Sequence, residues 1–445
     1  MSKKINRRDL FACTAAAGAA CMTVTPGSAT LAAPQVAEAA TEKPGAKKKA
    51  DVAWPIWDSR EENALLDVLN SGKWGRTGGG PQLDRFETAF AQKMKANFCI
   101  ATSAGTTALL TSLGALGIGP GDEVILPPYT FVATFNAITN SYALPKFVDS
   151  DAETFQIDPK KIAAAITDNT KLLLPVHIGG SPADMDAINT LAKARKIPVI
   201  EDACQAHLAE LHGQPVGTTA LAGCFSFQAS KNLNSGEGGA IITNDEEFAN
   251  LCFNFHTPGG TKPGASTGRG ANFRLTEFQA SLLMAQFSRL DQQATTRDAN
   301  AAYLSEMLRK IPGIAPARLV DGCTRSAWHL YMLRYDPQHF ASLTRTKLLS
   351  ELSKAGVSAS GGYSSLNRSK HVAALADNVH YQRLYGKATM ANWLEANHCP
   401  VNDTLCEQAM WLSQTQLLGT RTEMERIAET FADIQKRAGE LASQG

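Results

Sequence analysis

The segment Phe225-Ser226-Phe227-Gln228-Ala229-Ser230-Lys231 decides the fold, and a glycine-rich run, Gly236-Glu237-Gly238-Gly239, follows it closely. An apolar segment that ends in two carboxylates, Val199-Ile200-Glu201-Asp202, precedes it in the chain. A buried strand ending in an aspartate, followed by a small-residue loop ending in a lysine, supplies the two side chains that pyridoxal phosphate requires. Lys231 would form the Schiff base with the cofactor aldehyde. Asp202 would hold the proton on the pyridine nitrogen, so that the ring accepts electrons.

The overall composition is that of a globular protein. The chain has 445 residues, 44% of them hydrophobic and 19% charged, with a formal net charge of +1. This length is enough for two domains, each with a core of its own. A charge so close to zero gives no electrostatic reason to expect a nucleic acid or a membrane surface as partner. Past residue 50 no stretch is apolar over the roughly 18 residues that a membrane-spanning helix needs.

The first 40 residues have the features of an export signal. Two adjacent arginines, Arg7 and Arg8, stand in a basic start, an alanine-rich apolar stretch runs over residues 12–24, and residues 37–39 read Ala-Glu-Ala. This order is typical of a secreted chain, and the paired arginines resemble a twin-arginine signal. We therefore expect export to the periplasm. A cytoplasmic enzyme with a disordered tail, or a lipid anchor at Cys21, are the alternatives.

Cysteines give no sign of a metal site. The nine cysteines are scattered along the chain, and none of them has zinc-finger or Cys-x-x-Cys spacing. We therefore expect no bound metal. Cys399 and Cys406 are close enough in sequence for a disulfide, but two separate buried thiols are the simpler expectation.

Strand and helix signals alternate from about Trp54 onwards. Buried strands are expected at residues 98–102, 123–126, 145–148, 171–176, 198–201, 223–227 and 240–243. Helical stretches, such as residues 185–195, lie between some of them. Such alternation predicts an α/β fold with a mainly parallel, seven-stranded sheet covered by helices on both faces. Ligands of these sheets bind at the carboxyl ends of the strands.

A second, smaller α+β domain is expected in the C-terminal part. A long helix over about residues 276–308 should lead to it, and it should contain a strand at 330–335 and helices at 344–355 and 421–441. The predicted organisation is an export signal at 1–40, a flexible linker at 41–53, a large cofactor-binding domain at 54–300 and a small domain at 301–445.

A short turn predicts the binding site for the cofactor phosphate. Ser103-Ala104-Gly105-Thr106-Thr107 lies between a predicted strand and a predicted helix. Free N–H groups at the start of that helix would face an anion, and the helix dipole would add to the attraction. Ser226 could add its hydroxyl to the same phosphate. Taken alone, each of these features is also compatible with tight packing only.

Two further side chains are candidates for the cofactor ring. Gln205 can donate to the phenolic oxygen, and Phe131 can stack on the ring face; a surface amide and a core aromatic are the alternatives. Free lysine has a pKa near 10.4, and burial would lower it and make Lys231 a better nucleophile and base. The released amine could then move a proton between the substrate carbon and the cofactor, which is the central step of transamination.

From about Trp54 to the C-terminus the chain resembles the DegT/DnrJ/StrS family of aminotransferases, which has fold type I of the pyridoxal-phosphate enzymes. The stretches that carry this resemblance are residues 105–109, 119–125, 129–134, 149–158, 201–203, 225–231, 236–239, 272–277, 326–331 and 401–419. Leu208 departs from the family, which commonly has glycine after the residue equivalent to His207.

The resemblance implies the roles given above for Lys231, Asp202, Gln205 and Phe131. It also implies that the backbone amides of Gly105 and Thr106 and the hydroxyl of Ser226 bind the phosphate. Asn272 would reach the phosphate of a neighbouring subunit, so a homodimer with two shared active sites is implied.

The predicted function is a transaminase that moves an amino group from an amino acid, glutamate or glutamine, to a keto-sugar, a keto-cyclitol or a related ketone. A sugar dehydratase or deoxygenase is one alternative, although related dehydratases replace the lysine with histidine. A non-catalytic binding protein is another. His329 and Tyr363 lie where they could face the substrate, and Arg274 could bind a donor carboxylate; a core histidine and a structural ion pair are equally compatible with His329 and Arg274.

Overall fold

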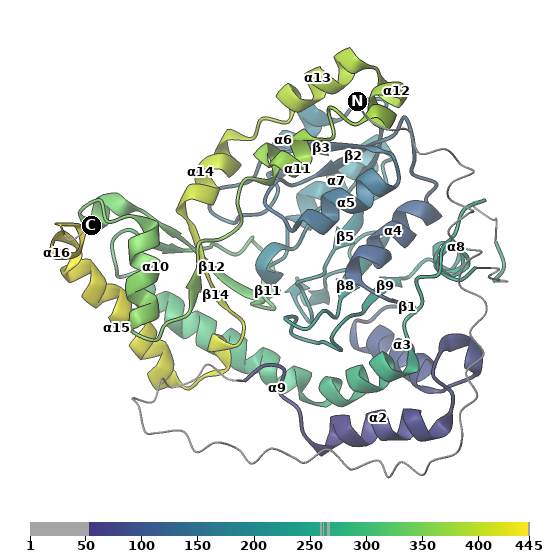
Figure 1. The fold of residues 1–445 in the computed structure, drawn as a ribbon, viewed down its shortest axis with the longest axis horizontal. Coiled ribbons are helices and arrows are strands. Elements are labelled where there is room, and N and C mark those ends of the chain that lie inside the picture. The colour runs from purple at the N-terminus through teal and green to yellow at the C-terminus, as the bar shows by residue number, and fades with distance from the viewer. Residues whose placement is uncertain (1–52, 259, 261, 265–267, 444–445) are drawn as a thin grey trace, which may run out of the picture. The chain divides into compact units, whose positions relative to one another are not determined.

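The computed structural model describes residues 53–258, 260, 262–264 and 268–443. The predicted export signal, residues 1–40, and all but the last residue of the predicted linker, 41–53, lie outside these ranges. Within them, no helix is both long and apolar enough to cross a membrane. Figure 1 shows the arrangement of the described elements.

Among the described residues, seven strands form the main sheet, in the order β1-β9-β8-β5-β4-β2-β3. Parallel bridges between Leu173 and Val199 and between Val176 and Asp202 join its two halves. Strand β9 runs antiparallel to both of its neighbours, and the remaining pairs are parallel. The prediction of a mainly parallel sheet is therefore confirmed. The strands are β1 (Phe98–Thr102), β2 (Glu123–Leu126), β3 (Leu144–Phe147), β4 (Thr170–Leu173), β5 (Ile200–Asp202), β8 (Ala222–Ser226) and β9 (Gly239–Thr243).

Helices cover both faces of this sheet, because successive strand residues point to opposite sides. In β9, Ile241 belongs to one core, whereas Ala240 and Ile242 belong to the other. The first face carries α4 (Gly105–Ala115), α5 (Val132–Asn140) and α8 (Glu246–His256). The second carries α3 (Gln82–Lys93), α6 (Pro159–Ala165), α7 (Met185–Arg195) and the first half of α9 (Glu277–Leu308).

Helix α9 connects the two main cores of the chain. It starts at the N-cap Thr276, where a capping box with Gln279 fixes its first turn. Its second half packs through Ala301, Leu304 and Leu308 under a second, antiparallel sheet of order β10-β12-β14-β13. The predicted domain boundary at residues 300 and 301 falls inside α9 and remains a prediction. The second sheet and its helices are β10 (Ile314–Pro316), β12 (Leu330–Tyr335), β13 (Ala359–Ser360), β14 (Ala409–Ser413), α10 (Arg345–Lys354), α15 (Arg421–Lys436) and α16 (Ala438–Ser443).

Part of the C-terminal region packs on the first core. Leu366, Val372 and Trp393 belong to the same cluster as the inner residues of α4 and α5, and the Trp393 indole donates to the carbonyl of Pro145 at 2.6 Å. Figure 1 shows this run of helices beside β2 and β3. None of its members was predicted: α11 (Lys370–Ala373), α12 (Val379–Tyr385), α13 (Lys387–Ala396) and α14 (Pro400–Gln408).

Three smaller features complete the fold. Helix α2 (Ser59–Ser71), also not predicted, packs on α9 through buried Glu61, which pairs with Arg289. A small sheet joins β11 (Cys323–Arg325) to β6 (Glu210–Leu211) and β7 (Gln214–Pro215). The prediction of one continuous last helix over 421–441 is wrong: α15 ends at Lys436 and α16 begins at Ala438, where Gly439 lowers helix propensity.

Candidate active site

A pocket of about 670 Å³ opens at the carboxyl ends of β5 and β8. It is lined by every predicted site residue except Asn272, that is by Gly105, Thr106, Phe131, Asp202, Gln205, Ser226 and Lys231. Asn272 is exposed and lies outside this lining. Of the three further candidates, His329 and Tyr363 line the pocket and Arg274 does not.

One end of the pocket is formed by the start of α4. Ala104 is the N-cap and offers no side-chain capping group, so the first N–H groups of the helix are turned to the pocket rather than to a cap. A Cβ at Gly105 would lie 2.7 Å from Cβ of Ser226 and 2.8 Å from Sγ of Cys204. Only glycine therefore lets Ser226 come so close to the helix N-terminus. The geometry is that of an anion cradle.

Asp202 is fixed at the end of β5. Its Oδ2 accepts a hydrogen bond from the Thr134 hydroxyl at 2.8 Å, and its Oδ1 accepts one from the backbone N–H of Cys204 at 3.2 Å. The side chain is almost entirely buried. A carboxylate held in this way has a defined direction and can pair with a cationic ring nitrogen in the pocket.

Glu201, next to Asp202, points to the opposite side of the sheet. It is fully buried and accepts hydrogen bonds from the backbone N–H groups of Gly217, Thr219 and Ala220 at 2.7, 2.9 and 3.0 Å. It also contacts Nε2 of His177 at 2.8 Å. Since Nδ1 of His177 accepts from the N–H of Ala183, Nε2 carries the proton and donates to Glu201.

Gln205 is held from both ends of its amide. Its Oε1 accepts from the N–H of Gly179 at 2.8 Å, and its Nε2 donates to the Tyr363 hydroxyl at 3.1 Å. Burial raises the pKa of Tyr363 to about 12, so this hydroxyl keeps its proton. The amide that was predicted to contact the cofactor thus also ties the pocket to the C-terminal part of the chain.

Leu208 adopts a strained backbone conformation close to this site. Its φ is 63°, in the left-handed region that favours glycine. The position at which the family resemblance implies glycine therefore has a backbone conformation that glycine adopts most easily. The Leu208 side chain is buried in the core behind the pocket, and its burial offsets the cost of the strained backbone.

Lys231 stands at the tip of a loop closed by backbone hydrogen bonds. Ala229 donates to the carbonyl of Gly236 at 2.8 Å, and Phe227 donates to that of Gly238 at 2.7 Å. Burial lowers the pKa of the Lys231 amine, and nearby Cys204 and Asp202 offset part of this effect. The amine is therefore more often unprotonated near neutral pH than an exposed lysine would be.

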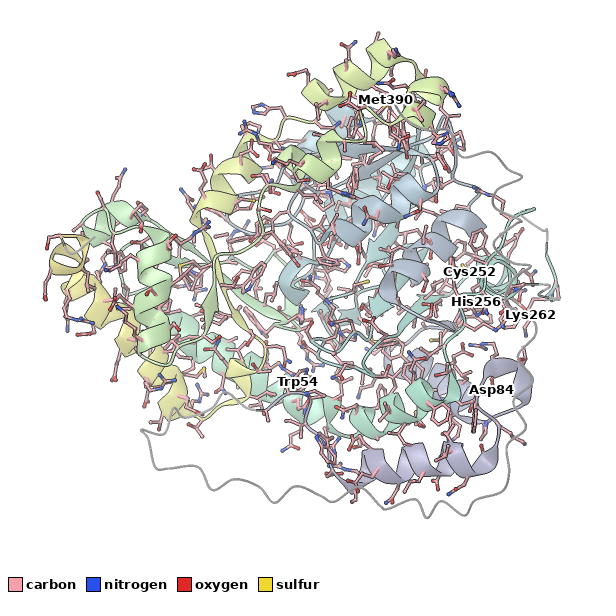
Figure 2. The ribbon with its side chains drawn as sticks, viewed as in Figure 1. Trp54, Asp84, Cys252, His256, Lys262 and Met390 are labelled. Carbon is pink, nitrogen blue, oxygen red and sulfur yellow. The ribbon has the colours of Figure 1, made fainter. Side chains whose placement is uncertain are left out.

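Trp54, which lies near the start of the described residues, supports the lysine loop. Its indole Nε1 donates to the carbonyl of Ala229 at 2.9 Å. The guanidinium of Arg297 lies over the indole ring, 5.5 Å from its centre. Figure 2 shows Trp54 beside α9, the helix that carries Arg297. A residue 175 positions away in sequence thus completes the loop.

Aromatic side chains also line the pocket. Phe131 exposes 57% of its surface although it lies in the pocket lining, so its ring face is available for stacking. Tyr363 and Trp411, which come from the C-terminal region, pack edge to face with their ring centres 4.7 Å apart. Trp411 and Thr134 were not predicted as site residues. Thr134 lies three residues after Phe131 in the helix that begins there, a spacing that could have indicated it.

In the described part of the chain, no group of three or more His, Cys, Asp or Glu side chains could hold a metal ion. Cys399 and Cys406 are free, buried thiols.

Pyridoxal phosphate fits the groups that the pocket brings together. The cradle at Gly105 and Ser226 suits its phosphate, the anchored Asp202 suits its pyridine nitrogen, and the partly buried amine of Lys231 suits its aldehyde. The ring of Phe131 is available to cover its face. The predicted role of each residue remains a prediction.

Known proteins resemble the chain over most of its length. It is 34% identical over 391 residues to 3-amino-5-hydroxybenzoate synthase of Amycolatopsis mediterranei (strain S699), covering 87% of this chain and 97% of that protein. It is 33% identical over 423 residues to L-glutamine:2-deoxy-scyllo-inosose aminotransferase of Streptomyces lividus, covering 88% and 96%. The NtdA structure from Bacillus subtilis, solved with bound cofactor PMP, is 30% identical with a TM-score of 0.71, covering 85% of this chain and 82% of that one.

Fold, pocket and relatives together define an aminotransferase of fold type I. The model of the DegT/DnrJ/EryC1/StrS aminotransferase family matches residues 55–432. The chain belongs to this family. Pyridoxal phosphate is the cofactor that membership implies, and it is the one the pocket fits.

The cradle at Gly105 leads to a first prediction. Gly105→Ala should weaken pyridoxal phosphate binding about tenfold or more, because the added methyl would press on Ser226 and Cys204 and move the start of α4 away from the phosphate. Gly119→Ala is the matched control, since the nearest atom to its new Cβ would be 3.8 Å away. Equilibrium titration with the cofactor, followed by its absorbance, measures both. Equal cofactor affinities of the two variants would show that the start of α4 at Gly105 does not bind the phosphate.

Proposed function

We propose that this enzyme transfers an amino group from an amino acid, L-glutamine or L-glutamate, to a keto-cyclitol, a keto-sugar or a related ring ketone. The observation that carries the proposal is the partly buried amine of Lys231, which lies in one pocket with an anchored carboxylate and an anion cradle. The choice of substrates is supported by relatives named for L-glutamine and 2-deoxy-scyllo-inosose. Similarity to a 3-amino-5-hydroxybenzoate synthase supports a six-membered ring as acceptor.

Each side chain has a defined part in this proposal. Pyridoxal phosphate supplies an electron sink for the carbon that gains or loses its proton. Lys231 holds the cofactor and then serves as the base and acid that moves this proton. Asp202, fixed by Thr134, keeps a negative charge directed at the pyridine nitrogen. Gln205 and Phe131 orient the ring, and Gly105, Thr106 and Ser226 retain the phosphate.

Replacing the lysine tests the proposal directly. Wild-type protein loaded with pyridoxal phosphate should keep a visible absorbance band through desalting, and Lys231→Ala and Lys231→Arg should both lose it, because neither side chain can bind the aldehyde. Adding L-glutamine or L-glutamate should bleach the wild-type band and release the matching keto acid, detected by mass spectrometry, whereas L-alanine serves as the comparison and should bleach it more slowly. A wild type without a lysine-dependent band, or one that no amino compound bleaches, would refute the proposal.

We further propose a homodimer in which Asn272 completes the phosphate site of the neighbouring subunit. Its support is the family resemblance together with the exposure of Asn272 outside its own pocket. Lys231→Ala and Asn272→Ala proteins should each be impaired, whereas co-expression with two different tags should yield hybrid dimers that regain activity. In such a dimer one site carries both lesions and the other carries none. Hybrids as impaired as the parent variants, or an active monomer by native mass spectrometry, would contradict the shared site.

Export by the twin-arginine route is the last part of the proposal. Its support lies in the sequence: paired arginines, an alanine-rich apolar stretch and an Ala-Glu-Ala site in the order of a signal. Changing Arg7 and Arg8 together to lysine should keep the protein in the cytoplasmic fraction, since the route reads the arginine pair itself. Lys3→Ala with Lys4→Ala is the control. An unchanged distribution between cell fractions after the arginine change would exclude this route.

A further inference from the structure

His329 lies within hydrogen-bonding distance of the reacting lysine, and the proposed function leaves it without a role. Its Nε2 lies 3.4 Å from Nζ of Lys231, and the ring is almost completely buried while lining the pocket. It belongs to the segment that leads into β12, far from the lysine loop in sequence. Two segments from different cores therefore meet at the lysine amine.

Hydrogen bonds around His329 determine which of its nitrogens carries the proton. The amide of Asn232, next to Lys231, donates through Nδ2 to the carbonyl of Ala327 at 2.6 Å. Its Oδ1 is thereby turned to Nδ1 of His329, at 3.3 Å. Because a carbonyl oxygen only accepts, Nδ1 must carry the hydrogen and Nε2 must keep its lone pair. That lone pair faces the amine of Lys231.

The surroundings of His329 keep the ring in this neutral form. Burial is the largest cause that holds the pKa of His329 well below its ordinary value. The basic groups that face it add to this effect, in the order Lys231, His207 and Arg297. A protonated ring would place a second cation beside the lysine and would also have no lone pair to offer. Above mildly acidic pH the ring can therefore act only as an acceptor towards Lys231.

The backbone holds the ring in place independently of the lysine. The carbonyl of His329 accepts a hydrogen bond from the N–H of Gln414 in the segment after β14, at 3.1 Å. The Gln414 side chain in turn accepts from the buried guanidinium of Arg297, at 2.9 and 2.6 Å. The acceptor is thus fixed from the C-terminal core, whereas the lysine belongs to a loop of the main sheet.

We infer that His329 is a positioning residue for Lys231: its neutral Nε2 accepts one N–H of the lysine amine and so directs the amine lone pair into the pocket. The inference rests on Lys231 being the reacting lysine of the proposed function. It assigns His329 a part in aiming the amine each time the lysine is released, and it requires no transfer of a proton to the imidazole.

Two substitutions separate this role from a packing role. His329→Gln can place an amide oxygen near the position of Nε2, whereas His329→Asn reaches only the position of Nδ1 and loses the acceptor that faces Lys231. His207→Asn is the matched control. That histidine is equally buried and has a pKa lowered to about 3, but its ring packs against Phe225 and Phe227 instead of the lysine.

The measurement is the rate at which full-length, cofactor-free protein takes up pyridoxal phosphate, followed by stopped-flow absorbance from pH 6 to 10. In His329→Asn the rate on the alkaline plateau should fall about tenfold, the size expected for one lost hydrogen bond. The midpoint of the pH profile should also move to lower pH, because the acceptor favours the protonated amine and its loss lowers the pKa of Lys231. His329→Gln and His207→Asn should both stay near wild type.

The outcomes distinguish a failure of the proposed function from a failure of the role inferred for His329. A wild type whose uptake does not depend on Lys231 overturns the proposed function itself. Lysine-dependent uptake with the same plateau and midpoint in His329→Asn and His207→Asn overturns the role of His329 only. Nitrogen-15 NMR of histidine-labelled wild type tests the protonation of His329 directly. The only variant it needs is His329→Gln, which identifies the His329 signals by their absence. Nε2 of His329 should show the shift of an unprotonated nitrogen throughout, and the opposite tautomer would refute the inference.

Discussion

The fully buried carboxylate of Glu201 is the constraint on which the rest of the site depends. Taking a carboxylate out of water costs several kcal/mol unless its oxygens are satisfied, and here three backbone N–H groups and the His177 ring satisfy them. The segment after β4 and the segment before β8 are thereby tied to β5. Since neighbouring strand residues point to opposite faces, fixing Glu201 on one face fixes Asp202 on the other. The direction of the catalytic-site carboxylate is therefore set from behind the sheet.

Around this fixed carboxylate the pocket is assembled from parts of the chain that lie far apart. The anion cradle comes from the start of α4, the carboxylate from β5 and the lysine from the loop after β8. Trp411 from β14 adds to the lining, and Trp54 supports the lysine loop through its bond to Ala229. Hydrogen bonds that cross between these parts, such as those from Gln205 to Tyr363 and from Lys231 to His329, are the means by which the two cores share one cavity.

Local sequence pattern was enough to predict the main sheet and several of the residues that line the pocket. Strands β1, β2 and β12 and helix α7 have the predicted bounds, because each is a short apolar or amphipathic segment between clear turn signals. Gly105, Asp202 and Lys231 could be placed at one edge because parallel strands bring their carboxyl ends together. Contacts made only in the tertiary structure left no pattern in the sequence. Examples are the hydrogen bond from the Trp54 indole to Ala229, the hydrogen bond from Thr134 to Asp202, and the place of Trp411 in the pocket lining. Helices α11–α14 were missed because their stability comes from packing on cores formed by residues far earlier in the chain, one core for α11–α13 and another for α14.

The bond from Trp54 to the lysine loop also concerns the order in which the protein is made. Trp54 leaves the ribosome long before Ala229, and Trp411 and the Gln414 that supports His329 leave later still. When Lys231 has been made, Trp54 and Phe131 are already present, whereas His329, Tyr363 and Trp411 are still missing. The pocket lining is therefore complete only after the late residues His329, Tyr363 and Trp411 have been made.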